Sequence, residues 1–104
     1  MSSTPSNVIS CAATGDLVST TSKAYREKLE QAITAAPANA TWTVLELDLR
    51  GARFIDSVGI NLIILMIRRM KERSCSVRVL ISSPNLKRVL SFMRVDQHAE
   101  IILA

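Results

Sequence analysis

Residues 42–60 read WTVLELDLRGARFIDSVGI, and this stretch decides the fold class. Its first half, Trp42 to Leu49, predicts a strand, because apolar residues dominate it while Glu46 and Asp48 stand two residues apart on the opposite face. The second half passes through the turn DSVG at residues 56–59 and enters an apolar segment, Ile60 to Arg73, with the spacing of a helix. The stretch therefore indicates a strand, a turn and a helix in succession.

The same alternation continues on both sides of this stretch. The further expected elements are a strand at Val8 to Ala12, a helix after Gly15-Asp16 that Ser19 or Thr20 caps and Pro37 ends, a strand at Val77 to Ile81, a helix with Ser83 as its cap and Pro84 at its first position, and a strand at Ile101 to Leu103. The expected buried face of the last helix consists of Leu86, Val89, Leu90 and Met93. Strands that alternate with helices in this way predict an α/β fold with a mainly parallel sheet.

A chain of 104 residues fits one domain. We expect residues 1–7, which are small and polar with one proline, to form a disordered leader and residues 8–104 to form the domain. The longest apolar run, Leu62 to Ile67, is far shorter than the roughly 20 residues that span a bilayer, and no secretory signal is visible. Cys11 and Cys75 match no metal spacing. These features predict a soluble cytoplasmic protein with reduced thiols and no membrane contact.

The formal net charge of +4 raises the question of nucleic-acid binding. The basic residues that cluster are Arg68, Arg69, Lys71, Arg73, Lys87, Arg88 and Arg94. Aromatic residues make up only 4% of the chain, and none alternates with these basic positions as a base-stacking surface requires. We therefore expect a solvated basic face, which would also suit an acidic protein partner, and no direct contact with nucleic acid.

Residues that could support catalysis are sparse. His98, the single histidine, has Asp96 and Glu100 two residues to either side, which is a poor spacing for metal ligands. Asp48 and Asp56 could hold Mg²⁺ at strand ends, as in a small magnesium-dependent phosphotransfer domain. Alternatively, Asp56 caps a helix and Asp48 faces solvent, and this second interpretation is the favoured one. We therefore expect no catalytic residues and neither a metal nor another cofactor.

Two roles are open for Ser57, which stands at the predicted strand-to-helix turn. In the first role it only caps the helix. In the second it is a control point, because free backbone N–H groups and the helix dipole tolerate a phosphate there. The about 1.5 to 2 added negative charges would expel an apolar or acidic partner. The helix that follows also carries an apolar surplus, Leu62, Leu65 and Met66, which either a neighbouring helix covers or a partner binds.

Three segments resemble the STAS domain of bacterial anti-sigma factor antagonists. They read VLELDL at 44–49, FIDSVGI at 54–60 and SPNLKRVL at 83–90, and the similarity extends from about Val8 to Ile102. The most specific part is the Asp-Ser-x-Gly turn in front of an apolar helix. The resemblance implies a small STAS-like α/β domain that binds other proteins and is not an enzyme.

In that family a partner serine kinase, which is also the anti-sigma factor, phosphorylates the serine that follows the aspartate. The resemblance gives Ser57 this role: the unphosphorylated protein binds the kinase, phosphorylation releases it, and a metal-dependent serine phosphatase restores it. Asp56 and Gly59 would shape the turn and the docking surface. The residues expected to bind the partner are Asp16, Ser19, Asp56, Val58, Gly59, Ile60, Leu62 and Met66.

The sequence departs from the family pattern in places. Val18 stands where the family usually has an acidic residue, and residues around Ser74-Cys75 and at Arg94 replace common glycines. Two other roles of the fold also stay open. One is a STAS scaffold; the other is an accessory binding module of lipid-transport machines, which tends to carry threonine at the position of Ser57.

Overall fold

The computed structural model describes residues 8–36 and 42–104. Along the chain the elements are β1 (Val8–Ala12), α1 (Ser22–Ala35), β2 (Val44–Asp48), α2 (Ser57–Glu72), β3 (Ser76–Ile81), α3 (Pro84–Phe92), the 3₁₀ helix η1 (Val95–Gln97) and β4 (Glu100–Leu103). Each strand and α-helix that we predicted is present, and β1 has the predicted bounds. Residues 1–7, the predicted leader, and Pro37 lie outside the described residues.

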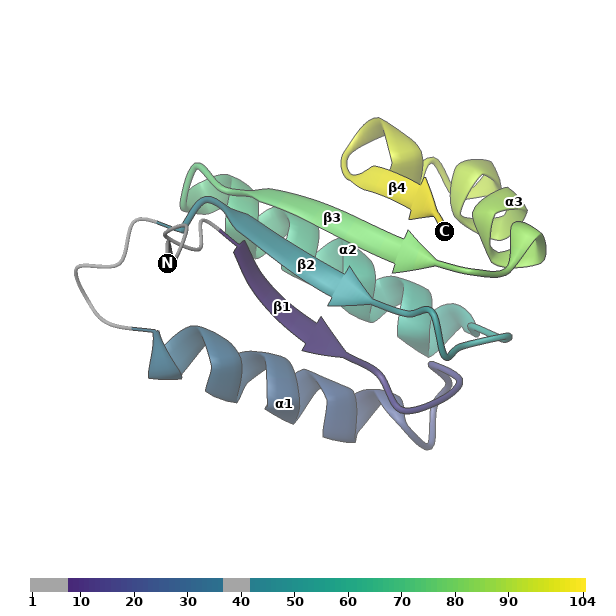
Figure 1. Ribbon diagram of the computed structural model, residues 1–104, viewed down its shortest axis with the longest axis horizontal. Coiled ribbons are helices and arrows are strands. Elements are labelled where there is room, and N and C mark those ends of the chain that lie inside the picture. Colours follow the sequence, from purple (N-terminus) through teal and green to yellow (C-terminus); the bar gives the residue numbers. More distant parts are fainter. Residues whose placement is uncertain (1–7, 37–41) are drawn as a thin grey trace, which may run out of the picture.

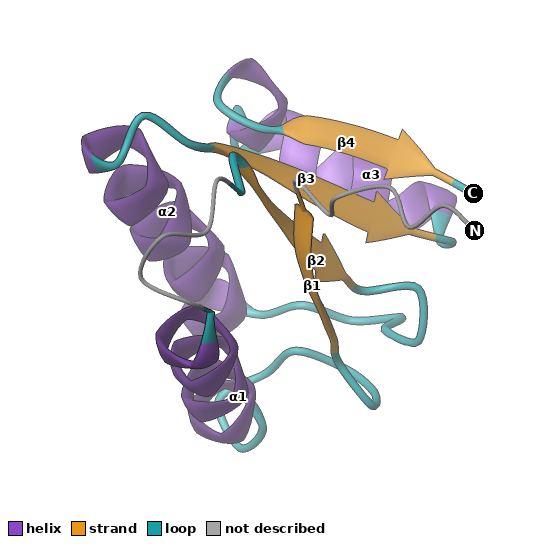
Figure 2. Ribbon diagram, turned by 60° about the vertical axis from the view of Figure 1, so that its left-hand side comes forward, coloured by secondary structure: helices purple, strands orange, loops and turns teal. Residues whose placement is uncertain are grey.

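The four strands form one sheet in the order β1-β2-β3-β4, and every neighbouring pair is parallel (Figure 1). Right-handed crossovers between strands in sequential order leave the connecting helices on one face of the sheet. Figure 2 shows α1 and α2 next to each other on that face. The predicted α/β fold with a parallel sheet is therefore confirmed.

The hydrophobic core lies between the sheet and the helices. Its strand residues alternate along the two central strands and are Leu45, Leu47, Leu49, Val77, Val79 and Ile81. Met66 of α2 and Leu90 of α3 belong to the same buried cluster. Full burial of an apolar side chain of this size stabilises a fold by about 1.5–3 kcal/mol, so the spacing of apolar residues that predicted the elements also holds them together.

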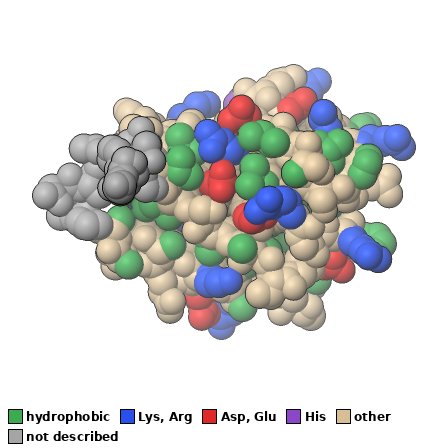
Figure 3. Space-filling model, viewed as in Figure 1, with side chains coloured by type: hydrophobic (Ala, Val, Ile, Leu, Met, Phe, Trp, Pro, Cys, Tyr) green, Lys and Arg blue, Asp and Glu red, His purple; other side chains and the backbone are tan. Residues whose placement is uncertain are grey.

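The opposite face of the sheet carries a ladder of polar side chains. Ser10, Glu46, Arg78 and Glu100 lie in register across the four strands. Arg78 binds Glu46 at 3.2 Å and Glu100 at 3.1 Å, and the Ser10 hydroxyl donates to Glu46 at 2.9 Å. Figure 3 shows acidic and basic side chains next to each other on the face turned toward the viewer. The predicted position of Glu46 opposite the core is confirmed.

The start of α1 differs from the prediction. The helix begins at Ser22, and Thr21 flanks it, so neither Ser19 nor Thr20 is the cap. A tight turn precedes the helix, in which the Val18 carbonyl accepts hydrogen bonds from the N–H groups of Thr21 (3.0 Å) and Ser22 (2.8 Å). Because the Val18 carbonyl already accepts hydrogen bonds from these N–H groups, the helix does not need a capping side chain from Ser19 or Thr20.

The buried face of α3 is narrower than predicted. Leu86 and Leu90 enter the core, but Val89 and Met93 are exposed. This helix spans only nine residues at one side of the sheet, over β3 and β4. One row of α3 side chains, four residues apart, is therefore enough to cover this part of the sheet. The predicted cap is correct, since the Ser83 hydroxyl accepts a hydrogen bond from the Leu86 N–H at 3.4 Å.

Candidate functional site

The turn that leads into α2 is built around Asp56, the N-cap residue of this helix. One carboxylate oxygen accepts a hydrogen bond from the Gly59 N–H at 3.0 Å, and the other accepts one from the Ser19 N–H at 2.7 Å. The Gly59 bond is the main reason why the pKa of Asp56 lies below its ordinary value, and the Ser19 bond lowers it further. Asp56 thus caps α2 and ties it to the loop before α1, as the favoured interpretation of this residue required.

A second aspartate, Asp16, lies in the loop before α1 and binds the loop before α2. The Asp16 carboxylate accepts hydrogen bonds from the N–H groups of Arg53 (2.8 Å) and Phe54 (3.1 Å), which lower its pKa. Between the two carboxylates, the Leu17 N–H donates to the Phe54 carbonyl at 3.0 Å, and the Asp56 N–H donates to the Leu17 carbonyl at 3.2 Å. The start of α2 is therefore held in a preformed geometry by both loops.

Gly59 permits the close approach of these loops. A Cβ atom at this position would collide with the Leu17 carbonyl oxygen and would come within 2.8 Å of a side-chain carbon of Ile55. Its backbone φ is not positive, so proximity and not backbone conformation requires glycine here. Gly59 thus shapes the turn, and the residue itself is buried. Its contribution to a docking surface stays a prediction.

Ser57 is the first residue of α2, and it is exposed. Its hydroxyl has no hydrogen-bond partner among the residues that the structure describes, whereas the Asp56 carboxylate occupies the capping position. The interpretation of Ser57 as the helix cap is therefore wrong, because a neighbouring side chain does that work. Its hydroxyl remains available at the N-terminal end of a helix, where backbone N–H groups favour an added anion.

Beside Ser57 a groove runs between α1 and α2, which we call the α1–α2 groove. It has a volume of about 320 Å³, and the residues that line it are Ser19, Ser22, Lys23, Arg26, Val58, Asn61, Leu62 and Leu65. The Val58 side chain is 44% exposed at one end of this groove. Ser19 and Val58, both predicted to bind a partner, are thus brought together around one hollow, and Lys23 and Arg26 are basic neighbours that the sequence pattern did not single out.

Several other residues of the predicted docking surface belong to the core instead. No part of the Met66 side chain is exposed, so the expectation that it contacts a partner is wrong, and Ile60 is also buried. Leu62 is buried at the floor of the α1–α2 groove. The physical reason is that α2 packs against both β3 and α1. Leu62 and Leu65 lie beside α1, as one of the two alternatives open from the sequence expected.

Val18 lies in the turn next to this site, and its side chain is half-buried. Its N–H donates to the Thr21 hydroxyl at 3.0 Å, and its carbonyl accepts hydrogen bonds from that turn. The backbone of Val18 therefore orders the loop whose next N–H, that of Ser19, binds Asp56. A carboxylate at position 18 is not needed for this connection.

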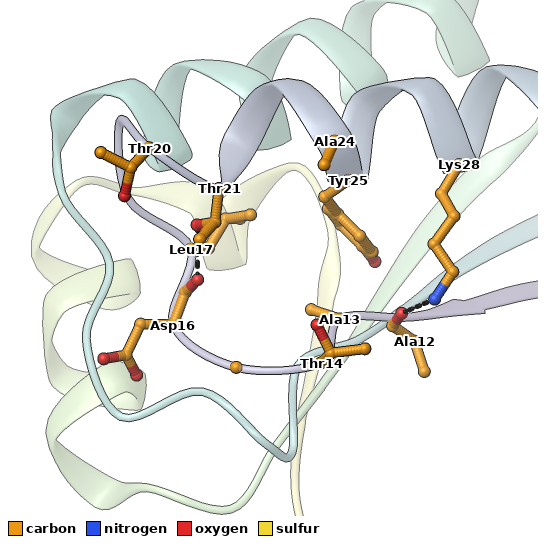
Figure 4. A pocket seen from close by; sticks show the side chains of 11 residues that line it. Ala12, Ala13, Thr14, Asp16, Leu17, Thr20, Thr21, Ala24, Tyr25 and Lys28 are labelled. Carbon is orange, nitrogen blue, oxygen red and sulfur yellow. Dashed lines mark hydrogen bonds between the residues drawn. The ribbon is translucent and has the colours of Figure 1, made fainter.

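Another hollow, of about 380 Å³, lies between α1 and the loop that follows β1 (Figure 4). Three of its polar groups have partners inside the protein. Lys28 donates to the Ala12 carbonyl at 2.8 Å, and the Thr21 hydroxyl donates to the Asp16 carbonyl at 2.6 Å. The Tyr25 hydroxyl donates to the Cys11 carbonyl at 2.8 Å, and burial raises its pKa.

The candidate catalytic groups do not come together in one site. Both oxygens of Asp48 bind the Arg50 guanidinium, at 2.9 and 2.8 Å, which is the main reason why the pKa of Asp48 is lowered. His98 is exposed just after η1. Within residues 8–36 and 42–104 no three side chains of His, Cys, Asp or Glu lie close enough together to hold a metal ion. In the same ranges, the helices are too short or too polar for one to cross a membrane.

Comparison with known proteins assigns the fold. A crystal structure of a proposed anti-sigma factor antagonist from Thermotoga maritima superimposes with a TM-score of 0.77 at 15% sequence identity. The alignment covers 94% of this chain and 80% of that chain. None of the curated proteins matches the sequence. The four-stranded parallel sheet with its helices thus shares the α/β fold of that protein.

A family model described as Mlab, STAS domain, matches residues 3–104, which is almost the whole chain. The chain therefore belongs to this STAS-domain family. The resemblance seen in the sequence is confirmed at the level of family and fold.

Proposed function

We propose that this protein is an anti-sigma factor antagonist that works by partner switching. With Ser57 unmodified, it binds a serine kinase of the anti-sigma type. The kinase then transfers the γ-phosphoryl group of ATP to the Ser57 oxygen, whose proton passes to a base of the kinase, and ADP leaves. The phosphorylated protein dissociates, and a metal-dependent serine phosphatase hydrolyses the phosphate. In this cycle the protein is the substrate of two cytoplasmic enzymes and not an enzyme itself.

The observation that carries the proposal is the free, exposed hydroxyl of Ser57 on a turn that other residues hold in place. A kinase must position the hydroxyl in line with the phosphoryl group, and a preformed turn lowers the entropic cost of doing so. Because Asp56 provides the cap, modification of Ser57 removes no hydrogen bond that the fold needs. Ser57 can therefore change its charge while the fold is retained.

The surroundings of Ser57 explain why a phosphate would act as a release signal. The modification adds about 1.5 to 2 negative charges next to the Asp56 carboxylate. On its other side Val58 exposes an apolar side chain that an unmodified partner can cover. Phosphorylation would thus place a strongly hydrated group at the edge of an apolar contact, and the partner would lose affinity through desolvation and charge repulsion.

The test is phosphorylation of the purified protein by a purified anti-sigma serine kinase with ATP, read by intact-mass spectrometry. We expect one added phosphate on the native protein and none on Ser57→Ala. Ser19→Ala is the matched control, because Ser19 lies across the same turn and binds Asp56 through its backbone N–H and not through its hydroxyl. Equal labelling of Ser57→Ala and native protein would refute the site.

The binding part of the cycle needs its own measurement. We expect Ser57→Asp to weaken the affinity for the kinase in a calorimetric titration by about tenfold or more, which corresponds to 1.4 kcal/mol. Its thermal stability should stay close to that of the native protein, because acidic residues are favourable in the first turn of a helix. An unchanged affinity would contradict the release mechanism even if Ser57 is phosphorylated.

A second candidate is a constitutive binding module, the accessory role left open by the sequence. The matched family model favours it, since its description names Mlab and not an anti-sigma antagonist. In that role Ser57 would be an unmodified contact residue. Binding of the partner that survives Ser57→Asp, together with an absence of phosphate in protein recovered from cells, would select this function.

A further inference from the structure

A second groove lies on the other side of α2, between its C-terminal half and the segment that joins α3 to η1. We call it the α2–η1 groove. Its volume is about 390 Å³, and its apolar lining consists of Ile64 and Ile67 from α2, Met93 after α3 and Val95 from η1. Met93 is 46% exposed, although the sequence pattern predicted that it faces the core. Of these four side chains Ile67 and Val95 are buried, Ile64 is half-buried and Met93 is exposed, so the domain leaves part of the apolar lining uncovered.

Basic side chains line the same groove. They belong to Arg68 and Lys71 of α2 and to Arg94, and the His98 ring completes the lining. No described acidic residue lines it, and none of these four side chains has a hydrogen bond or ion pair within the described ranges. The groove thus combines an apolar lining with cations that lack a counter-charge.

Two neighbouring basic residues, unlike those that line the groove, have interaction partners within the domain. Arg69 forms an ion pair with Glu30 of α1, and the Arg73 guanidinium lies 4.5 Å from the centre of the Trp42 ring. The basic residues of α2 and of its C-terminal cap position therefore divide into those with a partner in the domain and those without one. Arg69 and Arg73 are used inside the domain, whereas Arg68 and Lys71 are presented to the α2–η1 groove.

Arg94 supplies an independent observation. Its backbone φ is 61°, in the left-handed region at the C-terminal end of α3, where glycine is the least strained residue. The chain nevertheless carries a long cationic side chain at this position, and that side chain lines the groove. Strained backbone conformations of this kind cluster at binding and catalytic sites. Phe92, two residues earlier, is 85% exposed.

We propose that the α2–η1 groove binds an acidic, amphipathic segment of a protein partner. Apolar side chains of that segment cover Ile64 and Met93, and its carboxylates pair with Arg68 and Arg94, whose guanidinium groups match carboxylate geometry. This site lies on the side of α2 away from the α1–α2 groove, so it does not depend on the role of Ser57. A partner could therefore stay attached here while Ser57 changes its state.

The apolar lining argues against the other anionic occupants. A nucleic-acid backbone would leave Ile64 and Met93 uncovered, and none of the described residues that line the groove is an aromatic on which a base could stack. An anionic membrane would contact a protruding surface, whereas these residues line a hollow. A protein segment with both carboxylates and apolar side chains meets both features of the groove.

The first experiment is a selection of peptides from a randomised display library on the intact protein. The selected peptides are synthesised, and their affinities are measured by fluorescence anisotropy. We expect them to combine acidic and apolar residues and to bind Arg68→Glu/Lys71→Glu about tenfold more weakly or worse than the native protein. Lys23→Glu/Arg26→Glu is the matched control: it has the same spacing on α1 and the same change in net charge, and we expect unchanged affinity.

The second experiment separates the charge of Arg94 from the stability of the fold. Arg94→Gly removes the cation and also the steric strain of the left-handed backbone. We therefore expect weaker peptide binding together with an equal or higher melting temperature. Ser74→Gly relieves the other left-handed residue, φ 58°, outside the groove and should leave peptide affinity unchanged. Ser57→Asp should also leave it unchanged, which keeps this test separate from that of the proposed function.

Three results would overturn the inference. The first is that selected peptides are neutral or basic. The second is that peptide affinity is the same for the native protein, Arg68→Glu/Lys71→Glu and Arg94→Gly. The third is that a DNA duplex or anionic phospholipid vesicles bind the native protein more tightly than any selected peptide and lose that affinity in Arg68→Glu/Lys71→Glu.

Discussion

At its N-terminal end α2 is held by hydrogen bonds from two loops, whereas its C-terminal half borders a groove whose cations have no counter-charge. At the first end Asp16 and Asp56 both accept backbone hydrogen bonds across the loop boundary, and Gly59 lets the loops approach. At the second end the side chains of Arg68 and Arg94 form no hydrogen bond or ion pair with the described residues, and Arg94 has a left-handed backbone conformation.

The difference separates two ways in which a surface can be prepared for binding. A network whose donors and acceptors are all paired fixes a single geometry, and that suits a residue which another enzyme must recognise. Unpaired cations around an apolar hollow gain their partners only on association, so their interaction energy is available for binding. The same helix therefore presents a rigid site at one end and an unsatisfied one at the other.

Gly59→Ala is the change with the largest expected effect, because its new Cβ would collide with the Leu17 carbonyl. We expect the free energy of unfolding to fall by about 3 kcal/mol, since a backbone contact cannot yield as a flexible side chain can. Gly15→Ala is the control. It has open space around it and no positive φ, and it should be neutral or stabilising by about 0.4–1 kcal/mol. Urea titration of both variants measures the difference, and equal values would contradict the packing argument.

The acid dependence of stability probes the same end of α2. Hydrogen bonds from backbone N–H groups lower the pKa of Asp16 and Asp56 in the folded protein. A lowered folded-state pKa stabilises the fold above the unfolded value, and this stabilisation is lost as the pH falls through the folded-state pKa. We therefore expect Asp16→Asn/Asp56→Asn to be less stable than the native protein near neutral pH and the gap to narrow below about pH 4.

Urea midpoints measured from neutral to acidic pH test this expectation. Asp96→Asn serves as the control, because Asp96 is exposed on η1 and has no side-chain hydrogen bond in the described part of the chain. The native protein and the control should lose stability in parallel, while the double variant loses less. A double variant that follows the native curve at every pH would show that the two carboxylates do not hold the turn.

Ser74→Gly tests the opposite end of α2 and has the smallest expected effect. Ser74 adopts a left-handed conformation where α2 ends, and its N–H donates to the Lys71 carbonyl at 3.1 Å. Glycine removes the steric cost, so the free energy of unfolding should rise by up to about 1 kcal/mol. Ser74→Ala keeps the Cβ atom and should show no gain. Thermal melting compares the two, and a gain in both would mean that strain is not the cause.

The local part of the fold was predictable because it depends on neighbours along the chain. Alternation in β2 and the helical spacing after Ile60 follow from which side chains must be removed from water. The caps that use adjacent residues, Asp56 for α2 and Ser83 for α3, were also read correctly. The parallel sheet was also predicted correctly, since its strands alternate with helices along the chain.

The predictions that failed concern residues whose burial depends on another element. Periodicity places Met66 and Met93 on apolar faces, but it does not say which face a neighbouring helix covers. Met66 is buried because α2 packs against both β3 and α1, and the short span of α3 leaves Met93 exposed. The cap of α1 was misplaced for a related reason, because the turn built by the Val18 carbonyl satisfies its first N–H groups.

The sequence by itself determined the order of elements and the position of Ser57 at the start of a helix, because both follow from spacing along the chain, and its motifs carry the resemblance to the family. Only the tertiary structure decided that Ser19 and Val58 share a groove. The tertiary structure also decided which basic residues in and next to α2 interact with other side chains of the domain. These facts depend on contacts between residues that are distant in sequence, and such contacts are set by how the helices pack on the sheet.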